Sequence, residues 1–289
     1  MAKRQRDNGE QTQQRRSKEG RGIGTGANYM PYLLIHDVPS IGLASRVWGW
    51  KTNRIHHLLS RLELKFFYTL EWRPDVFDIR EQFPLDRDET LAIADRLGVR
   101  HPRDPKTKDY IVMTSDFVMT VKKGLVTEEQ IRTVKYKKDL DNKRVREKLD
   151  IERVYWQEIR GLDWDVVTEE DFDANVAANV EWLHGHRDVK CLAPLTAEDA
   201  IRVEALLTPR VAQGGFRLRD LTNECDTRLG LDPGASLSIV RHLLANRRWE
   251  VDMRTRIMPP LPLVLTAEPA CFNPDARRPS KSTAACTNR

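Results

Sequence analysis

The sequence has few cysteines, and no two of them lie close together. Cys191, Cys225, Cys271 and Cys286 are spread over the last third of the 289 residues and form no CxxC pair. Zinc ribbons and dithiol redox sites both need such pairs, so neither is indicated. Disulfide frameworks are typical of short secreted chains, and a chain of this length with so few cysteines favours a reducing compartment.

Long apolar runs are also missing. The mean hydropathy is -0.58, and 31% of the residues are charged. A membrane-spanning helix needs about 20 consecutive apolar residues, so we expect neither a span nor a membrane partner. Residues 1–21 are basic, but no apolar stretch follows them, and a signal peptide is therefore not expected. These absences predict a cytoplasmic protein.

A strong excess of one charge is missing as well. Lys and Arg number 48 against 43 Asp and Glu, which gives a net charge of +5 and an isoelectric point near 9.0. This balance is compatible with nucleic-acid binding but does not demand it, because what matters is where the charges cluster. The 40% of hydrophobic residues are enough for a core, and the length favours about two domains.

The N-terminal part predicts a flexible arm followed by a mixed α/β domain. Residues 1–28 are polar, basic and rich in glycine, which is typical of a flexible basic arm. Residues 29–168 alternate between helical and extended patterns, as an α/β domain does. Within them we expect helices over 56–71, 88–98 and 138–160, and strands over 76–85, 110–121, 129–137 and 164–168.

The C-terminal part predicts a second, mainly helical domain over residues 169–266. Helices that end in a β-wing are typical of winged-helix domains, and the pattern here is of that kind. The apolar spacing indicates helices over 171–184, 196–210, 217–229 and 235–247, and two short strands around a turn within 249–265. Residues 267–289 are rich in Pro, Ala, Ser and Arg and predict a disordered tail.

One set of residues could carry chemistry. Asp116 lies near the middle of an expected strand, where a buried carboxylate needs a partner, and the return strand carries Lys135. Glu63 lies beside the apolar stripe of the preceding helix. In restriction-type nucleases, acids in this arrangement hold Mg²⁺ through hard oxygen ligands, and a lysine orients the attacking water or neutralises the oxyanion. Spacing alone leaves open a plain hairpin with an edge aspartate and surface lysines.

Several ordered motifs carry a family resemblance. They are RIHHLLSRLELKFFYTLEW (54–72), DIREQFPL (78–85), TSDF (114–117) and EKLDIERVYW (147–156), together with KEGRG near Gly20 and NVEWL at 179–183. These motifs resemble TnsA, the family of endonuclease subunits of Tn7-type heteromeric transposases. The resemblance runs from about residue 17 to residue 182 and implies a restriction-endonuclease-like, mixed-sheet N-terminal domain.

The resemblance also implies roles for individual residues. Glu63 in SRLEL matches the family's catalytic glutamate on a helix, Asp116 in TSDF its metal-binding aspartate, and Lys135 in TVKYK its catalytic lysine. Glu152 in LDIERVYW matches an acidic residue implicated near the site. Two positions before the lysine the family has Gln, whereas this chain has Thr133, whose hydroxyl is a poorer metal ligand than a carboxylate.

The implied reaction is metal-dependent hydrolysis of DNA. Glu63, Asp116 and the Val134 carbonyl or water would hold Mg²⁺, with Mn²⁺ as a substitute, and Thr133 leaves the number of ions open. Cleavage would fall at the 5′ ends of the transposon during cut-and-paste transposition. Implied partners are double-stranded transposon-end DNA, a TnsB-like transposase that cuts and joins the 3′ ends, and a TnsC-like ATPase regulator contacted through the C-terminal region. The active protein would be associated with the bacterial nucleoid.

Basic residues follow the expected catalytic lysine. They are Lys137, Lys138, Lys143, Arg144 and Arg146. Lysine and arginine clusters of this kind bind the phosphates of the DNA backbone, so these residues are candidate DNA contacts. The alternative is a solvated helix face that is stabilised by ion pairs between successive turns.

Two other functions stay open. A non-catalytic DNA-binding or adaptor protein of the transposition complex would keep the fold, and Thr133 is the feature that favours it. A stand-alone restriction or resolvase-type nuclease would share the same fold. His56 and His57 are expected to cap the helix start or to pack rather than to bind metal. Ser115 has no histidine in a recognisable triad arrangement, so a serine hydrolase is not indicated.

Overall fold

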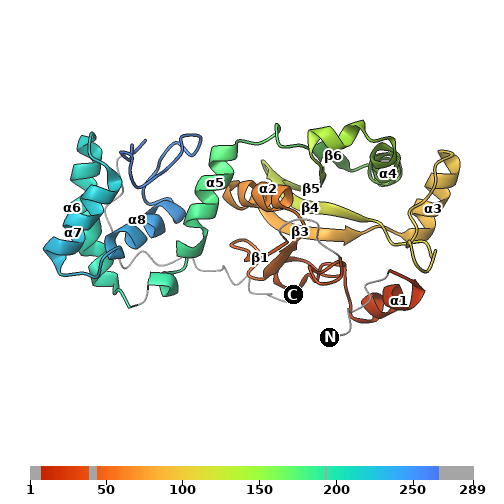
Figure 1. The fold of residues 1–289 in the computed structure, drawn as a ribbon, viewed down its shortest axis with the longest axis horizontal. Coiled ribbons are helices and arrows are strands. Elements are labelled where there is room, and N and C mark those ends of the chain that lie inside the picture. The colour runs from red at the N-terminus through yellow and green to blue at the C-terminus, as the bar shows by residue number, and fades with distance from the viewer. Residues whose placement is uncertain (1–7, 39–43, 193, 267–289) are drawn as a thin grey trace, which may run out of the picture. The chain divides into compact units, whose positions relative to one another are not determined.

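The computed structural model describes residues 8–38, 44–192 and 194–266 (Figure 1). Contacts divide the chain into two compact units, Met1–Glu181 and Trp182–Arg289. The sequence predicts a domain boundary after residue 168, whereas this division falls within the helix α5 (Ala174–Leu183). In the described ranges, no helix is both long and apolar enough to cross a membrane.

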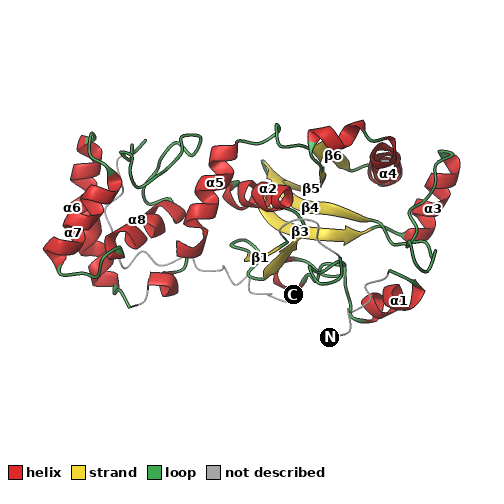
Figure 2. Ribbon diagram, viewed as in Figure 1, coloured by secondary structure: helices red, strands yellow, loops and turns green. Residues whose placement is uncertain are grey.

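The first unit is built on a four-stranded mixed sheet (Figure 2). Its strands, β3 (Val76–Pro84), β4 (Thr114–Lys123), β5 (Val126–Val134) and β6 (Asp163–Val167), lie in that order. The first two pairs are antiparallel and the last is parallel. Gly124 has a φ of 62°, which allows a tight turn between β4 and β5. The predicted mixed α/β class is confirmed.

A hairpin precedes the sheet and corrects one predicted boundary. β1 (Ser45–Trp48) pairs with β2 (Ile55–Leu58), whereas the sequence predicts a helix from residue 56. The helix α2 (Arg61–Trp72) begins only after Ser60, whose side chain accepts a hydrogen bond from the backbone N–H of Glu63 at 3.1 Å. A serine cap satisfies an N–H group that the first helical turn leaves unpaired, so the helix starts here.

Helices cover both faces of the sheet. Phe117 of β4 packs against Phe66 of α2, with ring centroids 5.5 Å apart. The next residue, Val118, points to the opposite face, as alternation along a strand requires. There it lies in one buried cluster with residues of α4 (Lys143–Arg153) and of the π-helical turn η3 (Val154–Ile159). α2 and α4 therefore pack on opposite sides of β4.

The long helix that the sequence predicts over 138–160 is divided into three parts. The 3-10 turn η2 (Lys137–Asp141) comes first, Asn142 then caps α4 through its side chain, and η3 continues from the end of α4. α3 (Arg87–Arg96) is close to its predicted position and contributes to the same cluster as α4. A short 3-10 turn, η1 (Gly26–Asn28), precedes the hairpin.

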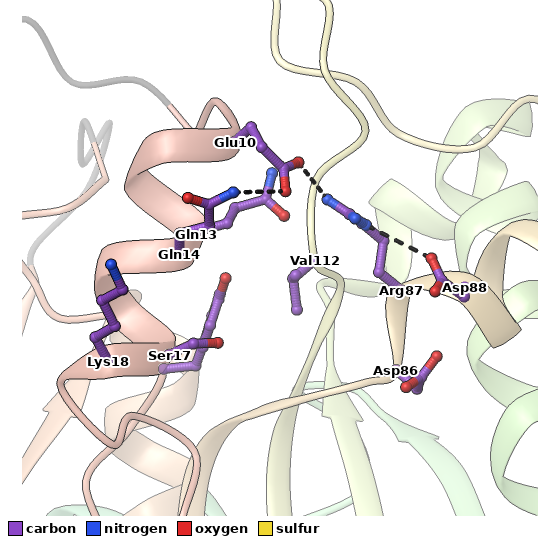
Figure 3. Close-up of a pocket in the computed structure, with 10 residues that line it drawn as sticks. Glu10, Gln13, Gln14, Ser17, Lys18, Asp86, Arg87, Asp88 and Val112 are labelled. Carbon is purple, nitrogen blue, oxygen red and sulfur yellow. Dashed lines mark hydrogen bonds and ion pairs between the residues drawn. The ribbon is translucent and has the colours of Figure 1, made fainter.

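The N-terminal segment is folded onto the first unit over its described residues. Composition predicts a flexible arm over 1–28, but α1 (Glu10–Lys18) forms there, and its Gln13 is buried. The Gln13 amide donates a hydrogen bond at 2.7 Å to a backbone carbonyl of the loop before β4. A hollow of about 400 Å³ lies beside α1, and Glu10 and Arg87 of its lining form an ion pair at 2.6 Å. Figure 3 shows these lining residues. Polar residues find partners here that composition does not reveal.

The second unit contains three main helices. α6 (Ala197–Gln213), α7 (Leu218–Leu229) and α8 (Ala235–Ala245) begin within a residue of the predicted starts. Thr196 and Asp199 form a capping box, which satisfies two backbone N–H groups at the start of α6. The 3-10 turns η4 (His184–His186) and η5 (Val189–Leu192) precede these helices.

The end of the second unit differs from its predicted form. The sequence predicts two strands over 249–265, but single antiparallel bridges stand in their place, among them Val251 with Leu265 and Arg217 with Pro262. The second unit is mainly helical, as predicted, and its likeness to a winged helix stays a prediction. The predicted tail over 267–289 lies outside the described residues.

Candidate active site

The candidate site begins where β4 and β5 separate. Backbone pairing between these strands ends at Phe117 and Arg132. One residue beyond this pair, Oδ2 of Asp116 accepts a hydrogen bond from the backbone N–H of Val134 at 2.8 Å. The carboxylate thus satisfies an N–H group that the strand ladder no longer reaches. This contact fixes a charged group in a buried position, because Asp116 is only 8% exposed.

Lys135 compensates the charge of this carboxylate. Its Nζ atom lies 2.8 Å from Oδ2 of Asp116 and donates a second hydrogen bond to the carbonyl of Val134 at 2.9 Å. Burial alone would lower the pKa of Lys135, but the charge and hydrogen bond of Asp116, together with the charges of Glu152 and Glu63, outweigh burial and raise it. Lys135 is therefore a cation and a hydrogen-bond donor at neutral pH, and not a base.

Glu63 joins this pair from the first turn of α2. Its Oε2 atom accepts a hydrogen bond from the backbone N–H of Leu59 at 2.9 Å, and the residue is buried. Burial, and next the negative charge of Asp116, raise the pKa of Glu63 to about 7. Two buried acids that lie close enough for one to raise the pKa of the other form an arrangement that a bound cation stabilises.

Glu152, from the C-terminal end of α4, is held by two hydroxyl groups. Its Oε1 atom accepts hydrogen bonds from Oγ of Ser115, at 2.5 Å, and from Oγ1 of Thr133. The indole N–H of Trp156 donates to the same Ser115 oxygen at 2.7 Å. Burial, and next the charge of Asp116, raise the pKa of Glu152. Glu152 thus lies within electrostatic range of the site, and its contacts are to hydroxyl groups on β4 and β5.

This network gives Thr133 a different task from that of an acid or amide at the same position. The Thr133 hydroxyl donates to Glu152, and the residue is only 2% exposed. Its proton is therefore used to fix Glu152 rather than to face a ligand. The side-chain oxygen that other restriction-type nucleases offer from this strand position is replaced here by a link between β5 and α4.

The donor set fits a hard divalent cation. The Glu63 and Asp116 carboxylates and the Val134 carbonyl are all oxygen ligands, which Mg²⁺ prefers, and Mg²⁺ ordinarily keeps several waters. Within the described residues, no three His, Cys, Asp or Glu side chains gather into a complete metal site. Two carboxylates, one carbonyl and water would therefore make up the ligand set, and the repulsion between the two acids favours a cation between them.

The five basic residues predicted to contact DNA lie on η2 and α4. Lys137 pairs with Glu170 at 2.6 Å, and Arg144 pairs with Glu147 at 2.8 Å. Arg146 donates to backbone carbonyls of η2. Lys138 and Lys143 are exposed, and the Lys138 amine lies 5.6 Å from the Tyr136 ring centroid. These residues thus lie on two consecutive elements, and Lys137 and Arg144 have acidic partners.

Sequence reasoning missed two arginines beside the predicted DNA contacts of α4 and one residue in contact with Glu63. Arg100 and Arg103 line a hollow of about 740 Å³ together with Arg144. They lie at the start and within a Pro- and Lys-rich loop, and only the fold brings them beside α4. Gln82 of β3 donates a hydrogen bond to Glu63 at 3.3 Å. It belongs to the DIREQFPL motif, but nothing in its residue type indicates this contact.

The mixed sheet carries two buried acids and a protonated lysine at the point where β4 and β5 separate. This arrangement is that of a nuclease of the restriction-endonuclease-like class. Comparison with known families is more specific. Residues 73–169 match the family described as "TnsA-like endonuclease N terminal", and residues 171–253 match "TnsA endonuclease C terminal". The chain is 38% identical over 232 residues to "Transposon Tn7 transposition protein TnsA" of Escherichia coli, a span of 80% of this chain and 82% of the relative. The chain belongs to the TnsA family of endonucleases.

Proposed function

We propose that the chain hydrolyses a phosphodiester bond at the 5′ ends of a transposon, with Mg²⁺ as its metal ion and Mn²⁺ as a substitute. The observation that carries this proposal is the convergence of Glu63, Asp116 and Lys135 where β4 and β5 separate. Two buried acids supply anionic ligands, and the protonated lysine supplies positive charge for the transition state. Membership of an endonuclease family found in transposition systems supports DNA as the substrate.

Glu63, Asp116 and the carbonyl of Val134 would hold the metal ion. When bound, Mg²⁺ supplies an activated water and stabilises negative charge on the phosphate. Lys135 is protonated, so its amine donates a hydrogen bond to the attacking water or to a non-bridging phosphate oxygen. The water oxygen adds to phosphorus and one P–O bond to a sugar breaks. The products are a phosphate monoester and a free hydroxyl group.

Glu152 acts as a positioning residue in this proposal. Ser115 belongs to β4 and Thr133 to β5, and both donate to the same carboxylate oxygen. The carboxylate thus ties the two strands together close to the point where their backbone pairing ends. The Thr133 departure favours a non-catalytic adaptor only if the site needs an oxygen ligand from that side chain. The Val134 carbonyl and water supply ligands without it.

Basic residues of η2, α4 and the preceding loop would bind the DNA backbone. Arg100, Arg103 and Arg144 surround one hollow, where their guanidinium groups can reach phosphate oxygens. Lys143 and Arg146 are exposed on the same helix as Arg144 and would add further phosphate contacts. Such contacts position the duplex but carry no sequence information, so recognition of the transposon ends falls to a partner.

The proposed partners follow from the same family. A TnsB-like transposase would cut and join the 3′ ends, and a TnsC-like ATPase would regulate the complex through the second unit. The matched relative is named as a transposition protein, and the second unit matches a family domain of its own, which supports a role within an assembly. Because the substrate is transposon DNA in a bacterial genome, we place the protein's action at the nucleoid.

A nicking assay on transposon-end DNA tests this function. We expect Mg²⁺-dependent cleavage at the 5′ ends in the presence of the cognate TnsB-like subunit. Asp116→Ala and Lys135→Ala should each lower the rate at least about 100-fold, because each removes a charge from the reacting centre. Asp88→Ala and Lys123→Ala change residues of the same types at exposed positions and serve as matched controls.

The outcomes separate the three functions. Cleavage that needs the partner supports the transposase subunit, and cleavage without any partner supports a stand-alone nuclease. DNA binding without metal-dependent cleavage under either condition supports the adaptor. Partner-dependent 5′ cleavage that survives both Asp116→Ala and Lys135→Ala would show that the site is assigned wrongly.

A further inference from the structure

Gln82 has an unusual backbone for its place in the fold. Among the described residues, four non-glycine residues have a positive φ, namely Asn53, Gln82, Lys108 and Arg247, and only Gln82 lies inside a strand. Its φ is 50°. Left-handed backbone is unfavourable for a residue with a side chain, and it persists in native proteins where the surrounding contacts impose it, often at functional sites.

This backbone allows β3 and β4 to change faces at the site. On one side of Gln82, Glu81 pairs with Phe117, and Phe117 packs against Phe66 of α2. On the other side, Phe83 pairs with Ser115, and Phe83 packs against Trp156 of η3, with ring centroids 5.8 Å apart. Residues two apart on a regular strand share a face.

The same change of face occurs on β4. Ser115 accepts a hydrogen bond from Trp156 of η3, although it lies only two residues from Phe117, which packs on α2. In both strands, therefore, the side chains change from one face of the sheet to the other between the pairs Glu81–Phe117 and Phe83–Ser115. Gln82 and Asp116 lie between these two pairs, so the left-handed backbone lies opposite the aspartate proposed to bind metal.

The Gln82 side chain is fixed at both ends of its amide. Thr114 donates from Oγ1 to the Gln82 carbonyl oxygen at 3.1 Å, so the amide nitrogen is the atom that faces Glu63. That nitrogen donates to Oε2 of Glu63 at 3.3 Å. The backbone carbonyl of Gln82 accepts from the N–H of Tyr32 at 3.2 Å. Gln82 is only 2% exposed, so its side chain is held in this orientation by the surrounding residues.

These contacts determine which carboxylate oxygen of Glu63 is available to coordinate a cation. The Leu59 N–H and the Gln82 amide both donate to Oε2. Oε1 is therefore the oxygen that can direct a lone pair toward a metal shared with Asp116. A carboxylate that is hydrogen-bonded on its distal oxygen keeps a single orientation, and such outer contacts tune metal affinity.

We propose that Gln82 is a positioning residue, which orients the Glu63 carboxylate so that one oxygen faces the metal ion. The proposal rests on the proposed function, because it assumes that Glu63 is a metal ligand. Gln82 touches neither substrate nor metal in this role. A purely structural role, as a hydrogen-bonded link between β3, β4 and α2, is the competing explanation.

Gln82→Gly separates the two explanations. Glycine adopts a positive φ readily, so this variant keeps the backbone conformation and removes the whole side chain, including the amide that donates to Glu63. We expect the metal-free variant to stay folded, because relief of the strained backbone offsets part of the stability that is lost with the buried hydrogen bonds. We expect Mn²⁺ to bind about tenfold more weakly in calorimetric titration without DNA, as is usual when an outer contact to a metal ligand is lost. The Mg²⁺ concentration for half-maximal cleavage should rise by a similar factor.

Two further variants keep the test decisive. Gln82→Glu retains the size of the side chain but replaces the donor with a second acid, so Glu63 loses its hydrogen bond and Mn²⁺ affinity should also fall. Asn53→Gly relieves a positive φ at an exposed loop position and should leave Mn²⁺ affinity unchanged. Parental Mn²⁺ affinity in a folded Gln82→Gly variant would overturn the proposal, as would a loss of thermal stability with no change in affinity.

The same titration distinguishes failure of this proposal from failure of the proposed function. Glu63→Gln should abolish Mn²⁺ binding whatever Gln82 does, because it removes a ligand. If Glu63→Gln binds Mn²⁺ as the parent does, Glu63 is not a ligand, and both proposals are wrong. If Glu63→Gln loses binding while Gln82→Gly and Gln82→Glu retain it, only the role of Gln82 is wrong.

Discussion

The Nζ atom of Lys135 lies 2.8 Å from Oδ2 of Asp116, so the charge of this aspartate is compensated within the protein. Among the described residues, no cation forms an ion pair with Glu63 in this way. Lys135 lowers its pKa only in part, and burial together with Asp116 still raises the pKa of Glu63 to about 7. The site thus keeps one acid poised between its two protonation states near neutral pH. A metal ion bound beside that acid would favour its charged form.

Glu63→Gln should stabilise the metal-free protein at alkaline pH. The pKa of Glu63 rises from its ordinary 4.5 to about 7 on folding, so the unfolded chain loses this proton first and stability falls as the pH rises from 4.5 to 7. Above pH 7 the variant should be more stable by about 3 kcal/mol, at roughly 1.36 kcal/mol for each pKa unit. Chemical denaturation at pH 4.5 and pH 8 measures this. A gain that is equal at both pH values would contradict the assignment.

The two hydroxyl groups that donate to Glu152 should be energetically coupled. Thr133→Val and Ser115→Ala each remove a donor to the same buried oxygen, and each should lower the free energy of unfolding by about 1–3 kcal/mol. The double variant should deviate from additivity by at least about 0.5 kcal/mol, as expected for residues in one network. Urea unfolding of the four proteins gives this energy.

The control for this cycle lies on the same strand. Thr127→Val changes the same residue type at an exposed position of β5, so it should cost little and add to Ser115→Ala without coupling. Coupling of similar size in the control would mean that β5 responds as a whole, and Glu152 would then not be the cause.

The charged residues of the site are predictable because their chemistry is visible in the sequence. An acid in the middle of a strand needs a partner, and Lys135 on the return strand is a candidate by residue type. Glu63 is less visible, since it lies on a separate helix and only the family motif connects it to Asp116. Gln82 is not predictable in this way. Its left-handed backbone depends on packing from both faces of the sheet, which residue type does not encode.

The differences between the predicted and the observed fold have a common physical origin. Residues 56–58 have helical apolar spacing but form β2, because pairing with β1 outweighs local preference. α1 occurs where composition predicts an arm, because its polar side chains find partners on residues far along the chain. Local patterns therefore predicted the elements of the sheet, whereas contacts between distant segments decided the boundaries.

The buried cluster around Glu81 should make the first unit sensitive to acid. Glu81 accepts hydrogen bonds from both Nη atoms of Arg54, at 2.9 and 2.6 Å, and from Nδ1 of His56 at 2.7 Å. Burial alone would raise the pKa of Glu81, but His56 and Arg54 outweigh it and hold the pKa far below its usual value. His56 therefore packs, as predicted, and does not cap α2.

A depressed carboxyl pKa gives stability that is complete above pH 4.5 and declines as the pH falls further. Glu81→Gln should destabilise the protein by about 3 kcal/mol at pH 7, since it leaves Arg54 buried without its anion. The difference from the parent should shrink by about 1.4 kcal/mol for each pH unit below 4.5. Glu89→Gln, at a surface ion pair with Arg160, serves as the control. A constant difference from pH 7 to pH 3 would contradict the prediction.

The arginines around the hollow beside α4 should determine how DNA binding depends on salt. Each cation that neutralises a phosphate contributes about 0.9 to the slope of log affinity against log salt concentration. Arg100→Ala and Arg103→Ala should therefore each lower the slope by about one, equally for transposon-end and unrelated duplexes, because phosphate contacts carry no sequence information.

Glu147→Gln removes the 2.8 Å partner of Arg144 and should strengthen binding. Arg202→Ala, at an exposed position of α6, should leave the slope unchanged. An unchanged slope in both Arg100→Ala and Arg103→Ala would mean that the DNA backbone does not contact this hollow.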